Sequence, residues 1–167
     1  MSRVSYLVIF EGDHAESNVA AFVPALDVSI MGDTYEETRT LVKEILNQEI
    51  ASLITRGQGI PSESARSETI ELAGESYPVL YESSSSVERC TAYIPGLRVR
   101  IAGMSLLDVR SKARTILESE LAERTTAGRP MPNDFVRIES VSVNLRHASH
   151  ILFRQKSFRN AEVLYNI

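Results

Sequence analysis

The sequence has 167 residues, of which 43% are hydrophobic and 24% charged, and its formal net charge is −4. This composition is typical of one sizeable globular domain or two small ones and argues against a disordered chain. The single cysteine, Cys90, excludes an intrachain disulfide framework and a cysteine zinc site, and no apolar run reaches the roughly 20 residues of a membrane-spanning helix. The acidic balance disfavours nucleic acid as the default partner. The lack of disulfides fits a reducing, cytoplasmic location.

The first 73 residues predict three strands, a helix and a final strand. The strands are expected at Val4–Glu11, Val19–Val23, Val28–Ile30 and Glu68–Leu72. Thr34, followed three residues later by Glu37, forms a capping box, which predicts the start of a helix. Gly57 predicts where that helix ends.

The chain then repeats this pattern. A shift of 71 positions aligns residues 6–72 with residues 77–143 without a gap. Identical pairs occur in strands, turns and helix alike, among them Tyr6/Tyr77, Glu11/Glu82, Pro24/Pro95, Gly32/Gly103, Arg39/Arg110, Gly57/Gly128 and Glu68/Glu139. In the second copy, Ser105 and Asp108 take the capping positions and Ile138–Val143 is the last strand. Because one offset holds throughout, we interpret the pattern as an internal duplication.

We therefore expect an α+β protein of two tandem βββαβ units, at 1–73 and 74–145, followed by a tail at 146–167. A unit of this size buries only about 60% of its unfolded surface, and its small sheet leaves an edge strand open. The two copies are thus expected to pack as an intramolecular pseudo-dimer, each closed by its own last strand. The third strands would pair across the pseudo-two-fold axis, where Asp27 would face Arg98. Further pairing between chains would give a homo-oligomer.

The first copy resembles the HicB-like antitoxin family in four motifs, YLVIFEG, VPAL, GDTYEET and GQGIPS, taken in this order. The resemblance implies a partial ribonuclease H-like fold without catalysis, and a function in binding and masking a small RNA-cleaving toxin. Members of the family usually carry a C-terminal DNA-binding domain. Since only residues 144–167 follow the second copy here, direct DNA binding is not expected. No catalytic residue, cofactor or metal ligand is predicted.

Charge suggests which part of the chain would meet such a toxin. Residues 1–73 hold 5 basic and 12 acidic residues, residues 74–145 hold 9 of each, and residues 146–167 hold 4 basic and 1 acidic. RNA-cleaving toxins tend to be basic, so the acidic first copy is a candidate docking face. The alternative is that these acids only solvate the surface.

The tail mixes basic and apolar residues. We expect it to pack on the fold or on another subunit, with RNA binding as the alternative. His147 and His150 are spaced for one face of a helix, but two ligands without a third make a weak metal signal.

Two other functions stay open. One is an orphan regulatory or RNA-associated scaffold without a toxin. The other is a metal-dependent nuclease, because ribonuclease H-like folds can carry paired carboxylates and acids recur in both copies. The recurring pairs are Glu11/Glu82, Glu37/Asp108, Glu49/Glu120 and Glu68/Glu139. Helix capping and solvent exposure account for much of this recurrence, which favours a binding protein over an enzyme.

Overall fold

The computed structural model describes residues 3–12, 17–84, 89–129 and 135–145, so the tail with His147 and His150 lies outside the described residues. The protein is α+β, with two antiparallel four-stranded sheets and two helices of 21 residues. The elements are β1 (Arg3–Gly12), β2 (Val19–Val23), the short helix η1 (Pro24–Leu26), β3 (Val28–Gly32), α1 (Tyr35–Thr55), β4 (Ala65–Leu72), β5 (Glu75–Ser84), β6 (Arg89–Ile94), β7 (Val99–Gly103), α2 (Leu106–Thr126) and β8 (Phe135–Asn144).

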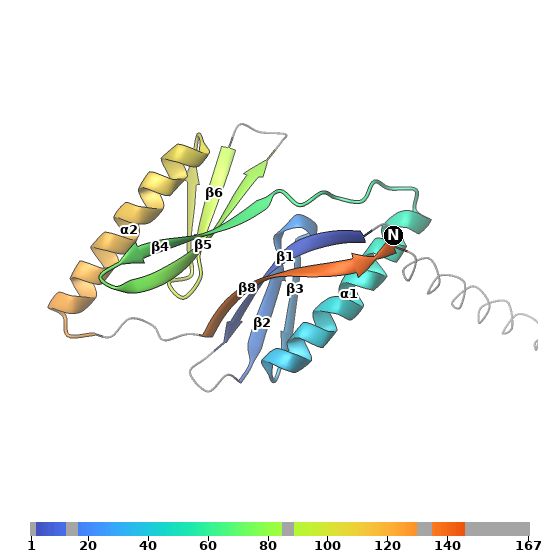
Figure 1. Ribbon diagram of the computed structural model, residues 1–167, viewed down its shortest axis with the longest axis horizontal. Helices are drawn as coiled ribbons and strands as arrows, with labels where there is room; N and C mark the ends of the chain where they lie inside the picture. Colours follow the sequence, from blue (N-terminus) through green and yellow to red (C-terminus); the bar gives the residue numbers. More distant parts are fainter. Residues whose placement is uncertain (1–2, 13–16, 85–88, 130–134, 146–167) are drawn as a thin grey trace, which may run out of the picture.

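Each sheet combines three consecutive strands of one half of the chain with one strand from the other half. Sheet A has the order β3-β2-β1-β8, and sheet B has the order β4-β5-β6-β7. Figure 1 shows the consequence: β4 leaves the side of α1 to join the sheet beside α2, while β8 comes back from the side of α2 to lie along β1. The two halves therefore exchange their last strands.

This exchange overturns the expectation that each final strand closes its own copy, and a turn explains it. Leu72 pairs with Glu75, so only Ala73 and Gly74 connect β4 to β5. Both connecting residues have positive φ, 53° and 81°. That geometry is typical of the two-residue turns that form β-hairpins. Because β4 is committed to this local hairpin, the edge of β1 is left for β8.

The helix boundaries follow local signals and agree with the sequence prediction. The Glu37 N–H donates to Thr34 Oγ1 at 3.2 Å, and the Asp33 N–H donates to Glu37 Oε2 at 2.9 Å. At the start of α2, the Asp108 N–H donates to Ser105 Oγ at 3.1 Å. Gly57 and Gly128 follow the helix ends with φ of 66° and 62°, as a left-handed C-cap requires.

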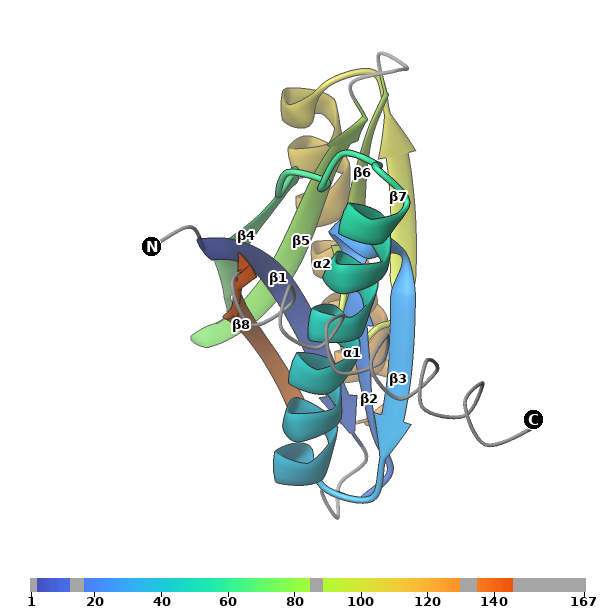
Figure 2. The ribbon, with the colours of Figure 1, turned by 90° about the vertical axis from the view of Figure 1, so that its right-hand side faces the viewer.

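Three apolar cores hold the layers together. Side chains alternate along β1, so Tyr6, Val8 and Phe10 pack with α1 in the first core. The second core packs α2 against sheet B through residues such as Ile94 and Leu117. The third core joins the two sheets and consists of Ile9, Ala65 and Leu80, with Leu7, Phe22, Tyr93 and Ile138 partly buried around them. The two helices accordingly lie on the outer faces of the paired sheets (Figures 1 and 2).

Candidate functional site

The recurring acids occupy separate structural positions rather than one centre. Glu37 and Asp108 cap the two helices, where Asp108 Oδ2 accepts from the Met104 N–H and from Lys112. Lys112 first, and then the Met104 N–H, lower the pKa of Asp108. Glu120 pairs with Arg124 on the surface of α2 at 2.7 Å. No group of three or more His, Cys, Asp or Glu side chains suited to a metal ion occurs within the described ranges.

Two of these acids tie the exchanged strands to the helices. Arg39 of α1 pairs with Glu139 of β8 at 3.1 Å, and Arg110 of α2 donates to Glu68 of β4 through Nε at 2.9 Å and through Nη2. Each ion pair joins a helix to a strand from the other half of the chain. At the 71-residue offset Arg39 aligns with Arg110, and Glu68 aligns with Glu139. The two ion pairs therefore join equivalent positions of the two halves.

Glu139 is the more buried of these two carboxylates. Burial opposes its ionisation, but hydrogen bonds from the Tyr35 hydroxyl and from Arg39 outweigh burial and lower the pKa of Glu139. Tyr35 itself packs edge-on against Phe10 with ring centroids 5.1 Å apart. This cluster therefore fixes the ionised carboxylate of β8 against the first turns of α1.

The third core, around Ile9, Ala65 and Leu80, forms a seam between the two sheets. Glu11 closes one end of this seam. Its Oε2 accepts a hydrogen bond from the Tyr93 hydroxyl at 2.7 Å, and its Oε1 accepts one from the Gly96 N–H at 3.3 Å. Burial first, and then the nearby Glu11 carboxylate, raise the pKa of Tyr93. The phenol consequently remains protonated and able to donate.

Arg100 spans the same seam. Its guanidinium lies 5.3 Å from the ring centroid of Phe22 in sheet A and 5.0 Å from that of Tyr93 in sheet B. The predicted pairing of the third strands is wrong, because β3 and β7 are edge strands of two different sheets and do not pair with each other. No ion pair joins Asp27 to Arg98 among the residues that the structure describes. Cation–π contacts of Arg100 connect the halves there instead.

Residues 56–64, between α1 and β4, form a crossing segment that leads from one sheet to the other. Glu63, a carboxylate that the sequence analysis did not single out, holds this crossing segment in place. Glu63 accepts from the Leu7 N–H at 2.5 Å and from the Ala65 N–H at 2.7 Å, while the Tyr6 hydroxyl donates to the Pro61 carbonyl at 2.8 Å. At the 71-residue offset Leu7 aligns with Pro78, whose backbone has no N–H and so needs no acceptor. This difference between the copies was the available signal for Glu63.

The two helices differ in how their acids are neutralised. All four acids of α2 form ion pairs: Asp108 with Lys112, Glu118 with Arg114, Glu120 with Arg124, and Glu123 with Arg129. Within the described part of the chain, the four acids of α1 form none; these are Glu36, Glu37, Glu44 and Glu49. Helix α1 therefore carries four acids against two bases, Lys43 and Arg39, and Arg39 pairs with Glu139 while it also attracts Glu36.

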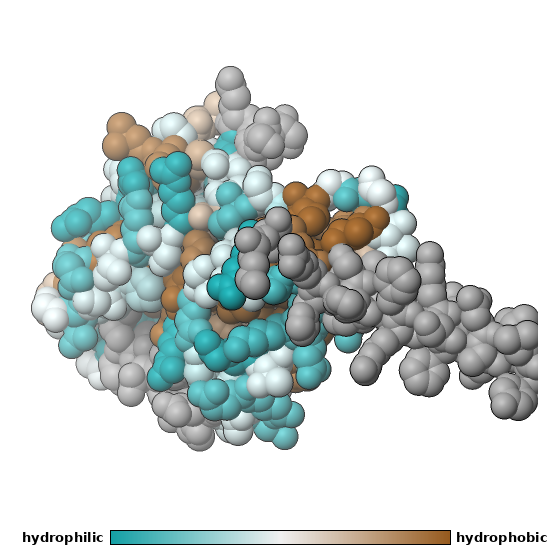
Figure 3. Space-filling model, turned by 45° about the vertical axis from the view of Figure 1, so that its right-hand side comes forward, coloured by the Kyte–Doolittle hydropathy of each residue, from teal (hydrophilic) through white to brown (hydrophobic). Residues whose placement is uncertain are grey.

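Within the described ranges, four large apolar side chains are exposed on the surface. The most exposed large ones in the described ranges are Met31, Met104 and Leu107, at 69%, 74% and 76%. The face in Figure 3 is mostly hydrophilic, with hydrophobic side chains in small separate areas. Neither helix is long and apolar enough to span a membrane.

Comparison of the chain with protein-family models, with curated proteins and with solved structures finds no match.

Proposed function

We propose that the protein is a non-catalytic binding module, similar to HicB-like antitoxins, that covers the active surface of a small basic RNA-cleaving toxin. In this proposal the chain arose by duplication of one βββαβ unit and forms an intramolecular pseudo-dimer by strand exchange. Matching registers support the duplication: Val8 pairs with Glu139, and Val79 pairs with Glu68, which is the same pairing shifted by 71. The four family-like motifs of the first copy support the antitoxin class.

The observation that carries the proposal is the charge contrast between the helices. Helix α1 presents acids without ion pairs in the described structure, whereas α2 neutralises all of its own. Exposed ion pairs add little stability, so their absence from α1 has little effect on the fold. An unpaired negative face does attract a basic partner and speed its association. Occlusion by this face requires no reacting group in the antitoxin.

The separate placement of the acids argues against the nuclease alternative. Two-metal phosphoryl chemistry needs carboxylates that converge on ions about 4 Å apart. Glu11 instead binds Tyr93 and Gly96, and Glu68 binds Arg110. These contacts give both carboxylates structural roles.

The test is co-expression of the full chain with a small basic RNA-cleaving protein encoded beside its gene. The intact chain should rescue growth, and its affinity for that protein should fall as salt is raised. The double variant Glu36→Gln/Glu44→Gln should weaken binding by about tenfold or more. Its matched control, Glu118→Gln/Glu123→Gln on α2, removes the same charge and should leave binding unchanged.

Equal binding by both variants would contradict the role of α1. Failure of the intact chain to bind or rescue would contradict the antitoxin proposal. If the intact chain instead bound RNA, the RNA-associated scaffold would be favoured.

A further inference from the structure

The seam between the sheets has a second end that lacks the closure made by Glu11. With the 71-residue offset, Glu82 corresponds to Glu11, Phe22 to Tyr93, and Ala25 to Gly96. Phe22 has no hydroxyl, so the donor that reaches Glu11 at 2.7 Å has no counterpart at Glu82. The aligned position therefore has the same acceptor without the tyrosine donor.

The contacts of Glu82 come from its own sheet and reach one oxygen. Thr91 Oγ1 donates to Glu82 Oε2 at 3.3 Å, and Arg100 Nη1 lies 3.8 Å from the same oxygen. Among the described residues, no donor of sheet A binds this carboxylate and Oε1 has no hydrogen bond. The Glu82 side chain is 26% exposed, and no buried side-chain oxygen of the described residues lacks a hydrogen bond, so the unbonded Oε1 is open to solvent.

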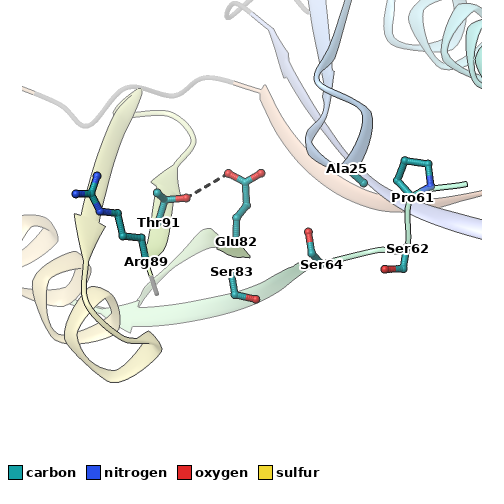
Figure 4. Close-up of a pocket in the computed structure, with 8 residues that line it drawn as sticks. All are labelled: Ala25, Pro61, Ser62, Ser64, Glu82, Ser83, Arg89 and Thr91. Carbon is teal, nitrogen blue, oxygen red and sulfur yellow. Dashed lines mark hydrogen bonds between the residues drawn. The ribbon is translucent and has the colours of Figure 1, made fainter. Parts of the chain in front are cut away.

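A hollow of about 710 Å³ opens beside Glu82, between η1, the segment before β4, and the strands β5 and β6. Figure 4 shows the Glu82 carboxylate between Thr91 and Ala25, with Ser62 and Ser64 on the crossing segment nearby and the Arg89 side chain directed away from Glu82. The lining carries four hydroxyls, the Glu82 carboxylate and one guanidinium, that of Arg89. The hydroxyls and the carboxylate accept hydrogen bonds. They suit a cationic ligand with several N–H donors, and a guanidinium has five in a fixed plane.

We propose that this hollow receives an arginine side chain of a basic protein partner, with Glu82 Oε1 as the charged acceptor. The choice of a protein partner rests on the proposed function, but the recognition of a guanidinium does not. Glu11 shows that a carboxylate at this place in the seam accepts two donors, here from Tyr93 and Gly96. At Glu82, where Thr91 already donates to Oε2, the incoming guanidinium donates to Oε1. Serine hydroxyls on the crossing segment accept its remaining N–H groups.

The probe is N-acetylarginine amide, titrated into the full-length, isotope-labelled protein and followed by amide NMR shifts. We expect saturable shifts at Ser62, Ser64, Glu82 and Thr91 with millimolar affinity. The neutral analogue N-acetylcitrulline amide has the same shape without the charge and should bind at least tenfold more weakly. Glu82→Gln should cause a similar loss for the arginine probe, and the charge-matched control Glu75→Gln should not.

Equal binding of the citrulline analogue, unchanged binding by Glu82→Gln, or shifts elsewhere on the surface would overturn the inference. None of these results would affect toxin binding through α1, which is measured separately with the Glu36→Gln/Glu44→Gln variant. If the protein binds the arginine probe but does not rescue toxin-expressing cells, the guanidinium site is supported and the antitoxin proposal is contradicted.

Discussion

Gly32 sits where β3 meets the first turn of α1, and no room exists there for a side chain. A Cβ at this position would lie 2.6 Å from Thr38 Oγ1 and 3.2 Å from the Thr38 backbone nitrogen. Thr38 is fully buried, and its hydroxyl lies 3.0 Å from the Val19 carbonyl oxygen and 2.8 Å from that of Thr34. The glycine thus permits a close approach between strand and helix.

We predict that Gly32→Ala lowers the free energy of unfolding by about 1–3 kcal/mol, because the buried threonine and its backbone must move. The control is Gly59→Ala in the segment before β4, where an added Cβ meets nothing within 4 Å. That substitution should change stability by less than about 0.5 kcal/mol. Urea unfolding measures both values, and equal effects would show that the approach at Gly32 is not tight.

At the scale of elements, the sequence predicts what local chemistry determines. Both helix starts depend on side chains within three residues, as at Thr34 and Ser105, and therefore agree with the structure. Strand positions follow from β-rich runs in the same way. The partners of the last strands were mispredicted, because the Ala73–Gly74 turn pairs β4 with β5, whereas the predicted closure required β4 to return to β1. The contacts of Arg100 between the sheets and of Glu63 with β1 follow from that exchange and were missed with it.

The exchange can be tested by crosslinking β8 to β1. Ser5 and Ser142 face each other across these strands, with their Oγ atoms 2.9 Å apart. In a Cys90→Ser background, Ser5→Cys/Ser142→Cys should form an intrachain disulfide on mild oxidation, because paired strand residues satisfy disulfide geometry. Mass spectrometry of the monomer would detect the loss of two hydrogens.

The matched control distinguishes the two topologies. If β4 closed its own copy in the equivalent register, Ser5 would face Glu71, since 142 − 71 = 71. Ser5→Cys/Glu71→Cys should therefore remain reduced under the same conditions. A disulfide in this control, or none in the Ser142 variant, would contradict the exchanged arrangement.

At the scale of the whole molecule, strand exchange makes each half depend on the other. Sheet A is completed by β8 and sheet B by β4, and each added strand is held by an ion pair to a helix. Neither half has a four-stranded sheet without the other. Strand exchange thus joins two halves that would each be marginal alone into one fold.

This dependence predicts the behaviour of residues 1–73 expressed alone. Two such chains should form a homodimer in which the strand equivalent to β4 crosses to the other chain's β1, as β8 does in the full protein. The register that pairs Val8 with Glu139 would then pair Val8 with Glu68, and Arg39 would meet Glu68 across the dimer. Arg39→Glu should weaken this dimer by like-charge repulsion, and Arg39→Glu/Glu68→Arg should restore part of its affinity. Light scattering after size-exclusion chromatography measures the mass, and a stably folded monomer of residues 1–73 would show that the halves do not need each other.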